Sequence, residues 1–121
     1  MNEQNHSKES DLSEKMEKLG FLTLESNGEE IYLLTATYYF LVVESRVDFE
    51  RGKRLYDFCK YTYNHRKKQT ELQKVYFQNI SKEVMIKKVA LYLIFMLEKK
   101  YLDTLRREEI LENAKILSKF E

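Results

Sequence analysis

The stretch TATYYFLVVESRVDFERGKRLYDFCKYTYN, residues 35–64, makes up about a quarter of the chain and decides the expected fold. Apolar and small side chains recur in it at steps of three and four residues. This spacing is typical of one stripe along an amphipathic helix. It predicts a long helix from about Thr35 to Asn64, whose stripe contains Tyr38, Leu41, Val42, Ser45, Phe49, Gly52, Leu55, Tyr56, Cys59, Thr62 and Tyr63.

The residues that follow this stretch also favour helices. The polar segment His65–Lys68 is expected to form a loop, and a shorter helix fits residues 70–78. Ser81 has a side chain suited to cap a helix that begins at Lys82. The segment Val89–Leu97 is apolar on all sides, which places that helix at the centre of a bundle.

Two further helices are expected nearer the ends of the chain. A short one fits Asp11–Leu19, and Gly20 follows at a position where helices commonly stop. A last helix, capped by Asp103 or Thr104, is expected to reach about Lys119. Its inward-facing residues are Ile110, Ala114 and Leu117.

The stretch KLGFLTLESNGEEIYLLT, residues 18–35, has a different pattern from the rest. Asn27-Gly28 suits the centre of a two-residue type I′ turn, because both central residues need positive φ. Pairing outward from that turn places Leu22 opposite Leu33 and Leu24 opposite Ile31. These four leucine and isoleucine residues then share one face, which we expect to lie on the helices. The sequence therefore predicts one β-hairpin at about residues 21–34.

This stretch resembles the wing segment of winged-helix DNA-binding regulators. In those proteins a helix ending in Leu-x-x-x-Gly runs into a hairpin, and a Tyr-x-Leu-Thr step leads into the next helix. The matching positions are Met16, Leu19, Gly20, Phe21, Asn27-Gly28 and Tyr32-Leu33-Leu34-Thr35. The likeness covers about 20 of the 121 residues and is local, because only about nine polar residues precede Asp11 where that family has two helices.

Composition indicates a single ordered domain. The chain has 121 residues, 43% of them hydrophobic and 34% charged, with three glycines and no proline. Such a chain is long enough to bury a core without metal or disulfide support. We predict a mainly α fold, in which residues 1–9 are loose and residues 10–121 form a bundle of four to five helices with the hairpin attached.

Several features favour a cytoplasmic protein. Cys59 is the single cysteine, so no disulfide can form within the chain, and the first residues lack the apolar core of a secretory signal. The longest uncharged runs, Ile31–Val43 and Val89–Leu97, fall short of the roughly 18 apolar residues that a membrane-spanning helix needs. Membrane insertion is therefore not expected.

Motifs that carry catalysis are scarce. The two histidines, His6 and His65, lie in polar segments, and the six-residue separation of Cys59 and His65 is not a metal-ligand spacing. No glycine-rich phosphate loop, HExxH or GxSxG element occurs. We expect a protein that is not an enzyme, has no catalytic residues and needs no metal or cofactor.

The charge is unevenly distributed although the net charge is only +1. Residues 1–30 carry three lysines and eight acids, whereas residues 46–74 carry nine Lys or Arg and four acids. Residues 46–74 could bind an anionic partner, because cations neutralise phosphates and aromatic rings can stack on bases. The alternative is that their cations form the solvated face of an amphipathic helix. The candidate binding residues are Arg51, Arg54, Lys60, Tyr61, Arg66, Lys67 and Lys68.

Ser45, Gly52 and Cys59 lie seven residues apart on the expected long helix. Small residues at that spacing let a second helix approach closely. They predict a packing track for another helix of the chain or for the symmetry mate in a homodimer.

These features together predict a small regulatory or adaptor protein that binds another macromolecule, most simply another protein. The alternative is a DNA- or RNA-binding regulator that uses the basic segment 46–74 and the wing-like hairpin.

Overall fold

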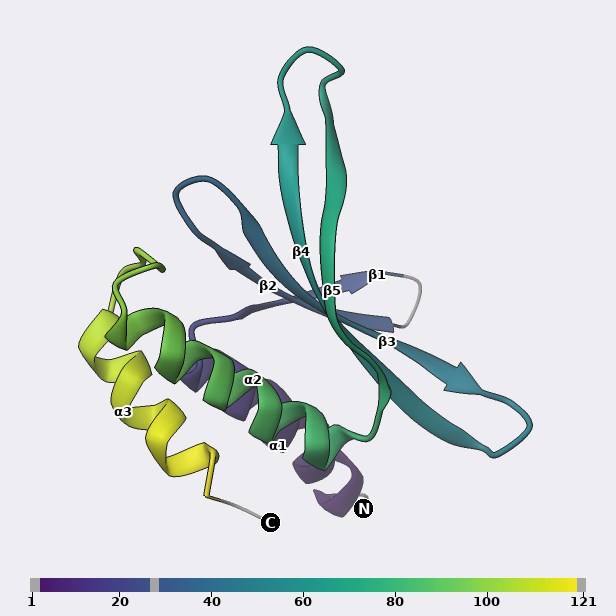
Figure 1. Ribbon diagram of the computed structural model, residues 1–121. Coiled ribbons are helices and arrows are strands. Elements are labelled where there is room, and N and C mark those ends of the chain that lie inside the picture. The colour runs from purple at the N-terminus through teal and green to yellow at the C-terminus, as the bar shows by residue number, and fades with distance from the viewer. Residues whose placement is uncertain (1–2, 27–28, 120–121) are drawn as a thin grey trace.

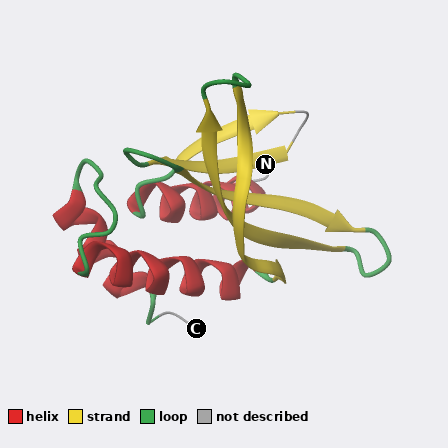
Figure 2. Cartoon of the chain, turned by 45° about the horizontal axis from the view of Figure 1, so that its top comes forward, coloured by secondary structure: helices red, strands yellow, loops and turns green. Residues whose placement is uncertain are grey.

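The computed structural model describes residues 3–26 and 29–119, which form a five-stranded sheet and three helices (Figure 1). Each strand pairs antiparallel with the next one in the chain, in the order β1-β2-β3-β4-β5. The helices cover one face of the sheet (Figure 2). The elements are α1 (Glu3–Lys18), β1 (Leu22–Ser26), β2 (Glu29–Thr35), β3 (Phe40–Asp48), β4 (Lys53–Asn64), β5 (Gln69–Ile80), α2 (Lys82–Glu98) and α3 (Arg107–Leu117).

The predicted helical bundle is wrong, because residues 35–64 form strands and not a long helix. Most of this stretch is β3 and β4, joined by a turn in which Gly52 has a φ of +64°. Gly52 thus lies where the chain reverses between two strands and not on the stripe of a helix. Valine, tyrosine and phenylalanine are abundant here and favour strands. The short helix expected at residues 70–78 is likewise replaced by β5.

The three- and four-residue spacing wrongly indicated a helix, because β3 and β4 have apolar residues on both faces of the sheet. Leu41, Val42 and Val43 are consecutive and all buried, and so are Phe58 and Cys59. Neighbouring residues of a strand point to opposite faces, so burial on both faces removes the two-residue alternation. Helix-like steps can then be drawn through residues that are in fact on different faces.

The β1–β2 hairpin has the register that the sequence predicts. Leu22 pairs with Leu33 and Leu24 pairs with Ile31. The Asn27-Gly28 turn lies outside the described residues. The predicted buried face is wrong: Leu22 and Leu24 are 62% and 41% exposed, whereas the alternate residues Tyr32 and Leu34 are buried in the core. The hairpin forms one edge of the sheet and is not a separate wing.

The helices and the inner face of the sheet enclose one core. α1 supplies Leu12 and Met16, and α2 supplies Met85, Val89 and Leu93. α1 begins at Glu3, before the expected start at Asp11. α3 packs on α2, and Asn113 Nδ2 of α3 donates a hydrogen bond of 3.1 Å to the Lys18 carbonyl at the end of α1.

Two of the helix predictions near the C-terminus are confirmed and two are wrong. Ser81 caps α2 and accepts a hydrogen bond from the Val84 N–H, and the expected inward residues of α3 are buried. However, α2 lies at the surface of the molecule, since Leu91 and Phe95 are 50% and 52% exposed. α3 is preceded by Arg106 at its N-cap and not by Asp103 or Thr104.

Within residues 3–26 and 29–119, no helix is both long enough and apolar enough to cross a membrane.

Candidate binding surfaces

The sheet face that points away from the helices carries an unbroken apolar row. Leu22 of β1 pairs with Leu33 of β2, and the pairing continues through all five strands. Val42 and Cys59 are buried but do not belong to the core that the helices share. The row consists of Leu22, Leu33, Val42, Cys59 and Val75.

Further apolar side chains flank this row on the same face. Phe40 pairs with Tyr61 and Tyr61 pairs with Leu72, which places a second row across β3, β4 and β5. Leu24 and Ile31 extend the face on the other side of the first row. Leu72 and Val75 are 52% and 42% exposed. We call these two rows together with Leu24 and Ile31 the open face.

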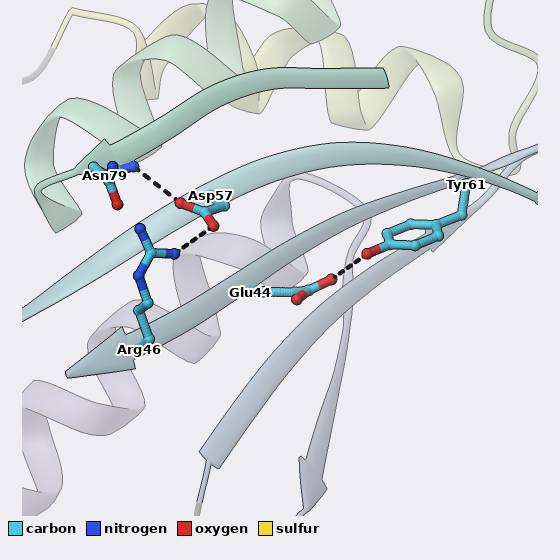
Figure 3. Close-up of polar contacts among 5 residues, drawn as sticks. All are labelled: Glu44, Arg46, Asp57, Tyr61 and Asn79. Atoms are coloured by element: carbon cyan, nitrogen blue, oxygen red, sulfur yellow. Dashed lines mark hydrogen bonds and ion pairs between the residues drawn. The ribbon is translucent and has the colours of Figure 1, made fainter. Parts of the chain in front are cut away.

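A cluster of polar residues adjoins the open face where β3 and β4 pair (Figure 3). Arg46 Nη1 lies 2.6 Å from Asp57 Oδ2, and the Asn79 backbone N–H donates a 2.9 Å hydrogen bond to Asp57 Oδ1. The Tyr61 hydroxyl donates a 2.8 Å hydrogen bond to Glu44 Oε1. Glu44 and Asp57 are directly opposite each other, so these donors offset the repulsion between two carboxylates.

Burial raises the pKa of two groups on this face. The pKa of Tyr61 rises to about 12 through burial, then through its hydrogen bond to Glu44 and the charge of that carboxylate. The pKa of the Cys59 thiol rises to about 11 through burial and then through the charges of Glu44 and Asp57. Both side chains are therefore protonated at neutral pH, and the thiol is a weak nucleophile.

Cys59 is expected to react with iodoacetamide at pH 8 at least tenfold more slowly in the folded protein than in urea. A rise from the ordinary value of 9.0 to about 11 lowers the thiolate population at pH 8 by about 100-fold. The rate is measured by mass spectrometry. Because the folded protein holds this proton to higher pH, ionisation of Cys59 reduces stability as pH rises from about 9 to 11. Equal rates in buffer and urea would contradict the burial of Cys59.

The structure distributes the predicted anion-binding residues over both ends and both faces of the sheet. Arg51 and Arg54 lie at the β3–β4 turn, whereas residues 66–68 lie at the β4–β5 turn. β4 has 12 residues and spans roughly 35 Å at about 3.3 Å per residue. Lys60 points to the helix side, where its Nζ lies 4.6 Å from the centre of the Tyr39 ring, while Tyr61 points to the open face. The seven residues therefore do not form one site.

The predicted packing track of Ser45, Gly52 and Cys59 does not exist as a continuous surface. Ser45 pairs with Tyr56 of the core and accepts a hydrogen bond of 2.9 Å from Arg54 Nη1. Cys59 lies on the open face and Gly52 lies in the β3–β4 turn. The homodimer stays a prediction, but the long helix expected to form its interface is replaced by β3 and β4.

The β4–β5 hairpin projects beyond the helices as an arm (Figure 1). We define the arm as residues 60–74. Its turn is held by Asn64, whose Oδ1 accepts hydrogen bonds from the backbone N–H groups of Arg66 and Lys67 at 3.0 and 3.1 Å. Lys68 has a φ of 54°, which completes the reversal of the chain. The run His65–Lys68, expected to be a loop, therefore forms a defined turn at the tip.

A hollow of about 560 Å³ lies between the end of α1, the β2–β3 turn and the start of α3. Its charged lining residues are Asp103 and Arg106, and the Arg106 guanidinium forms two hydrogen bonds with Glu109 at 3.0 and 3.2 Å. Within the described part of the chain, no three His, Cys, Asp or Glu side chains gather as metal ligands would. This hollow thus offers no arranged set of catalytic groups.

The chain was compared with family models, curated proteins and solved structures, and nothing matched.

Proposed function

We propose that this protein is a non-enzymatic regulatory or adaptor protein of the cytoplasm that binds another protein through its open face. The observation that carries the proposal is the apolar row that crosses all five strands. Its outermost members, Leu22 and Val75, are 62% and 42% exposed. The two edge strands thus leave apolar side chains of this row in solvent, and exposed apolar patches mark protein–protein interaction sites.

The dimensions of the open face suit a partner of ordinary size. Five strands at about 4.8 Å spacing place β1 and β5 roughly 19 Å apart, and stacked layers pack about 10 Å from a sheet. A stable interface buries about 800 Å² on each partner. An apolar centre with a polar border is the usual anatomy of such an interface, and the Arg46–Asp57 and Tyr61–Glu44 contacts provide that border.

The groups on the open face also support binding in preference to catalysis. Cys59 is protonated, and the two carboxylates beside it each have a hydrogen-bond donor within the sheet. These polar side chains are satisfied by one another and fix the local geometry. The lone thiol supports a reducing compartment, which is why the partner is expected in the cytoplasm.

The double substitution Leu22→Glu/Leu24→Glu is expected to abolish partner binding without unfolding the protein. Both side chains are exposed on an edge strand, so their loss costs little stability, whereas two carboxylates on the apolar face oppose docking. Tagged full-length protein is used to recover partners from extracts of the organism that makes it. Recovery of the partner is expected to fall at least tenfold, which corresponds to a loss of about 1.4 kcal/mol.

The matched control is Leu91→Glu/Phe95→Glu, which places the same two charges on the exposed side of α2. This variant is expected to recover the partner as well as the wild-type protein does. Loss of the partner with the α2 variant alone would move the binding site to the helices and contradict the proposal. Light scattering of the purified wild-type protein shows whether a second copy occupies the face, since a dimer mass would then fall to a monomer mass in Leu22→Glu/Leu24→Glu.

A further inference from the structure

The arm concentrates positive charge that the rest of the chain lacks. Residues 60–74 contain five Lys or Arg and one acid, which gives a net charge of +4, whereas the whole chain has a net charge of +1. The remaining residues therefore carry a net charge of −3. Figures 1 and 2 both show the tip of this hairpin well away from the helices, and residues 65–70 are all exposed.

Two lysines of the arm face each other across the strands. Lys60 of β4 pairs with Lys74 of β5, an arrangement of like charges that normally destabilises a sheet. Each ammonium group lies near an aromatic ring, Lys60 over Tyr39 at 4.6 Å and Lys74 over Tyr76 at 5.2 Å. Among the described residues, neither lysine forms an ion pair. An anionic ligand would relieve this repulsion.

The tip offers two more cations without acidic partners. Lys67 forms an ion pair with Glu71 at 3.6 Å, but Arg66 and Lys68 have no such partner among the residues that the structure describes. The Asn64 side chain fixes the backbone of this turn through two hydrogen bonds. Arg66 and Lys68 are therefore presented on an ordered turn, which follows the end of β4 at Asn64, about 13 Å along the strand from Lys60 at roughly 3.3 Å per residue.

We infer that the arm binds the phosphates of double-stranded DNA, with the hairpin lying in the major groove. The major groove of B-form DNA is about 12 Å wide and admits a two-stranded β-ribbon, whereas the major groove of an RNA duplex is too narrow. Cations at the tip and at the Lys60–Lys74 pair then contact phosphates at separate points along the groove. The tip of the arm is distant from β1, where the test of the open face is made, whereas the Lys60–Lys74 pair lies on the side of the sheet that the helices cover.

The aromatic rings of the arm argue against a single strand as the ligand. Stacking on unpaired bases requires free ring faces. The Tyr61 hydroxyl donates a hydrogen bond to Glu44, and Tyr63 packs edge-on with His65 at 4.9 Å between ring centres. These contacts orient both rings within the protein, whereas Arg66 and Lys68 are exposed at the tip, so the cations are the more available groups of the arm.

The test measures binding of the full-length protein to a fluorescently labelled 20-base-pair DNA duplex of mixed sequence by anisotropy. The wild-type protein is expected to bind at about 50 mM salt with a dissociation constant between about 1 and 100 µM. Arg66→Gln/Lys68→Asn is expected to weaken binding at least tenfold. It should also reduce the slope of log K against log salt by about 1.8, because each phosphate contact contributes about 0.9. Asparagine is chosen at position 68 because it tolerates the positive φ of Lys68.

The matched control is Arg51→Gln/Lys53→Gln, which removes the same charge from the hairpin turn at the opposite end of β4. This control is expected to bind within twofold of the wild-type protein, and circular dichroism verifies that both variants are folded. Equal losses in the two variants would show attraction by net charge and overturn the inference. Absence of saturable binding to the DNA duplex, or binding of a single strand or an RNA duplex as tightly as the DNA duplex, would overturn it too.

Discussion

Replacing Phe58 with alanine is expected to lower the free energy of unfolding by about 4 kcal/mol, the usual range for a buried phenylalanine being roughly 3–5. The Phe58 side chain is fully buried on β4. Its ring centre lies 5.2 Å from that of Tyr76 and 5.3 Å from that of Tyr92. Phe58 therefore joins the sheet to α2, and its loss leaves a cavity between the two layers.

Urea unfolding followed by circular dichroism measures this loss, with Tyr63→Ala as the control on the same strand. Tyr63 is 43% exposed, so its removal is expected to cost less than about 1 kcal/mol. Comparing Phe58→Ala with Tyr63→Ala also shows whether residues 58–63 form a strand or a helix. On a helix, Tyr63 would lie on the apolar stripe and Phe58 off it, so a larger loss for Tyr63→Ala would contradict the sheet.

Gly20→Ala is expected to lower the free energy of unfolding by about 3 kcal/mol. Gly20 links α1 to β1 with a φ of +91°, a conformation that costs other residues roughly 1–2 kcal/mol. A Cβ atom there would lie 2.6 Å from Ile110 Cδ1 and 3.3 Å from Leu34 Cδ1. Both neighbours are buried, so the added methyl overpacks the junction of α1, β2 and α3 by roughly 1–3 kcal/mol.

The control for Gly20 is Gly52→Ala, because Gly52 also has a positive φ but an added Cβ there has no atom within 4 Å. It is expected to cost about 1 kcal/mol, from the backbone alone. Adding Ile110→Val to Gly20→Ala removes the methyl group that clashes, and the double variant is expected to recover part of the loss. Equal effects at Gly20 and Gly52, with no recovery by Ile110→Val, would show that packing at Gly20 is unimportant.

Local signals predicted those elements whose structure depends on neighbouring residues. The β1–β2 register followed from Asn27-Gly28 and the spacing of Leu22, Leu24, Ile31 and Leu33, and its pairing is observed. The Ser81 cap depends on the next three residues, and it too is observed. The helices predicted within residues 35–80 were wrong, because both faces of β3 and β4 bury apolar residues and the strand pattern is therefore hidden. The turns near Gly52 and His65, about 12 residues apart, were the signal that favoured strands.

The candidate surfaces depend on how the helices pack on the sheet and were therefore harder to predict. Leu22, Leu24, Ile31 and Leu33 were correctly placed on one face, but the opposite face is the one covered, by α1 on β1 and by α2 on β4 and β5. The basic residues were grouped because they are close in sequence. Strand β4 separates Arg51 from Arg66 by its full length, so only the tip and the Lys60–Lys74 pair remain together on one hairpin.

The order of the strands has a consequence for synthesis on the ribosome. Each strand pairs with the one made just before it, so the sheet can grow strand by strand as the chain emerges. Met85, Val89 and Leu93 of α2 are made only after β5 is complete. Until they arrive, Phe58 and its neighbours lack the helix that covers them, and the nascent sheet is apolar on both faces. The unfinished chain is thus a better substrate for chaperones than the finished protein, in which the helices cover one face of the sheet.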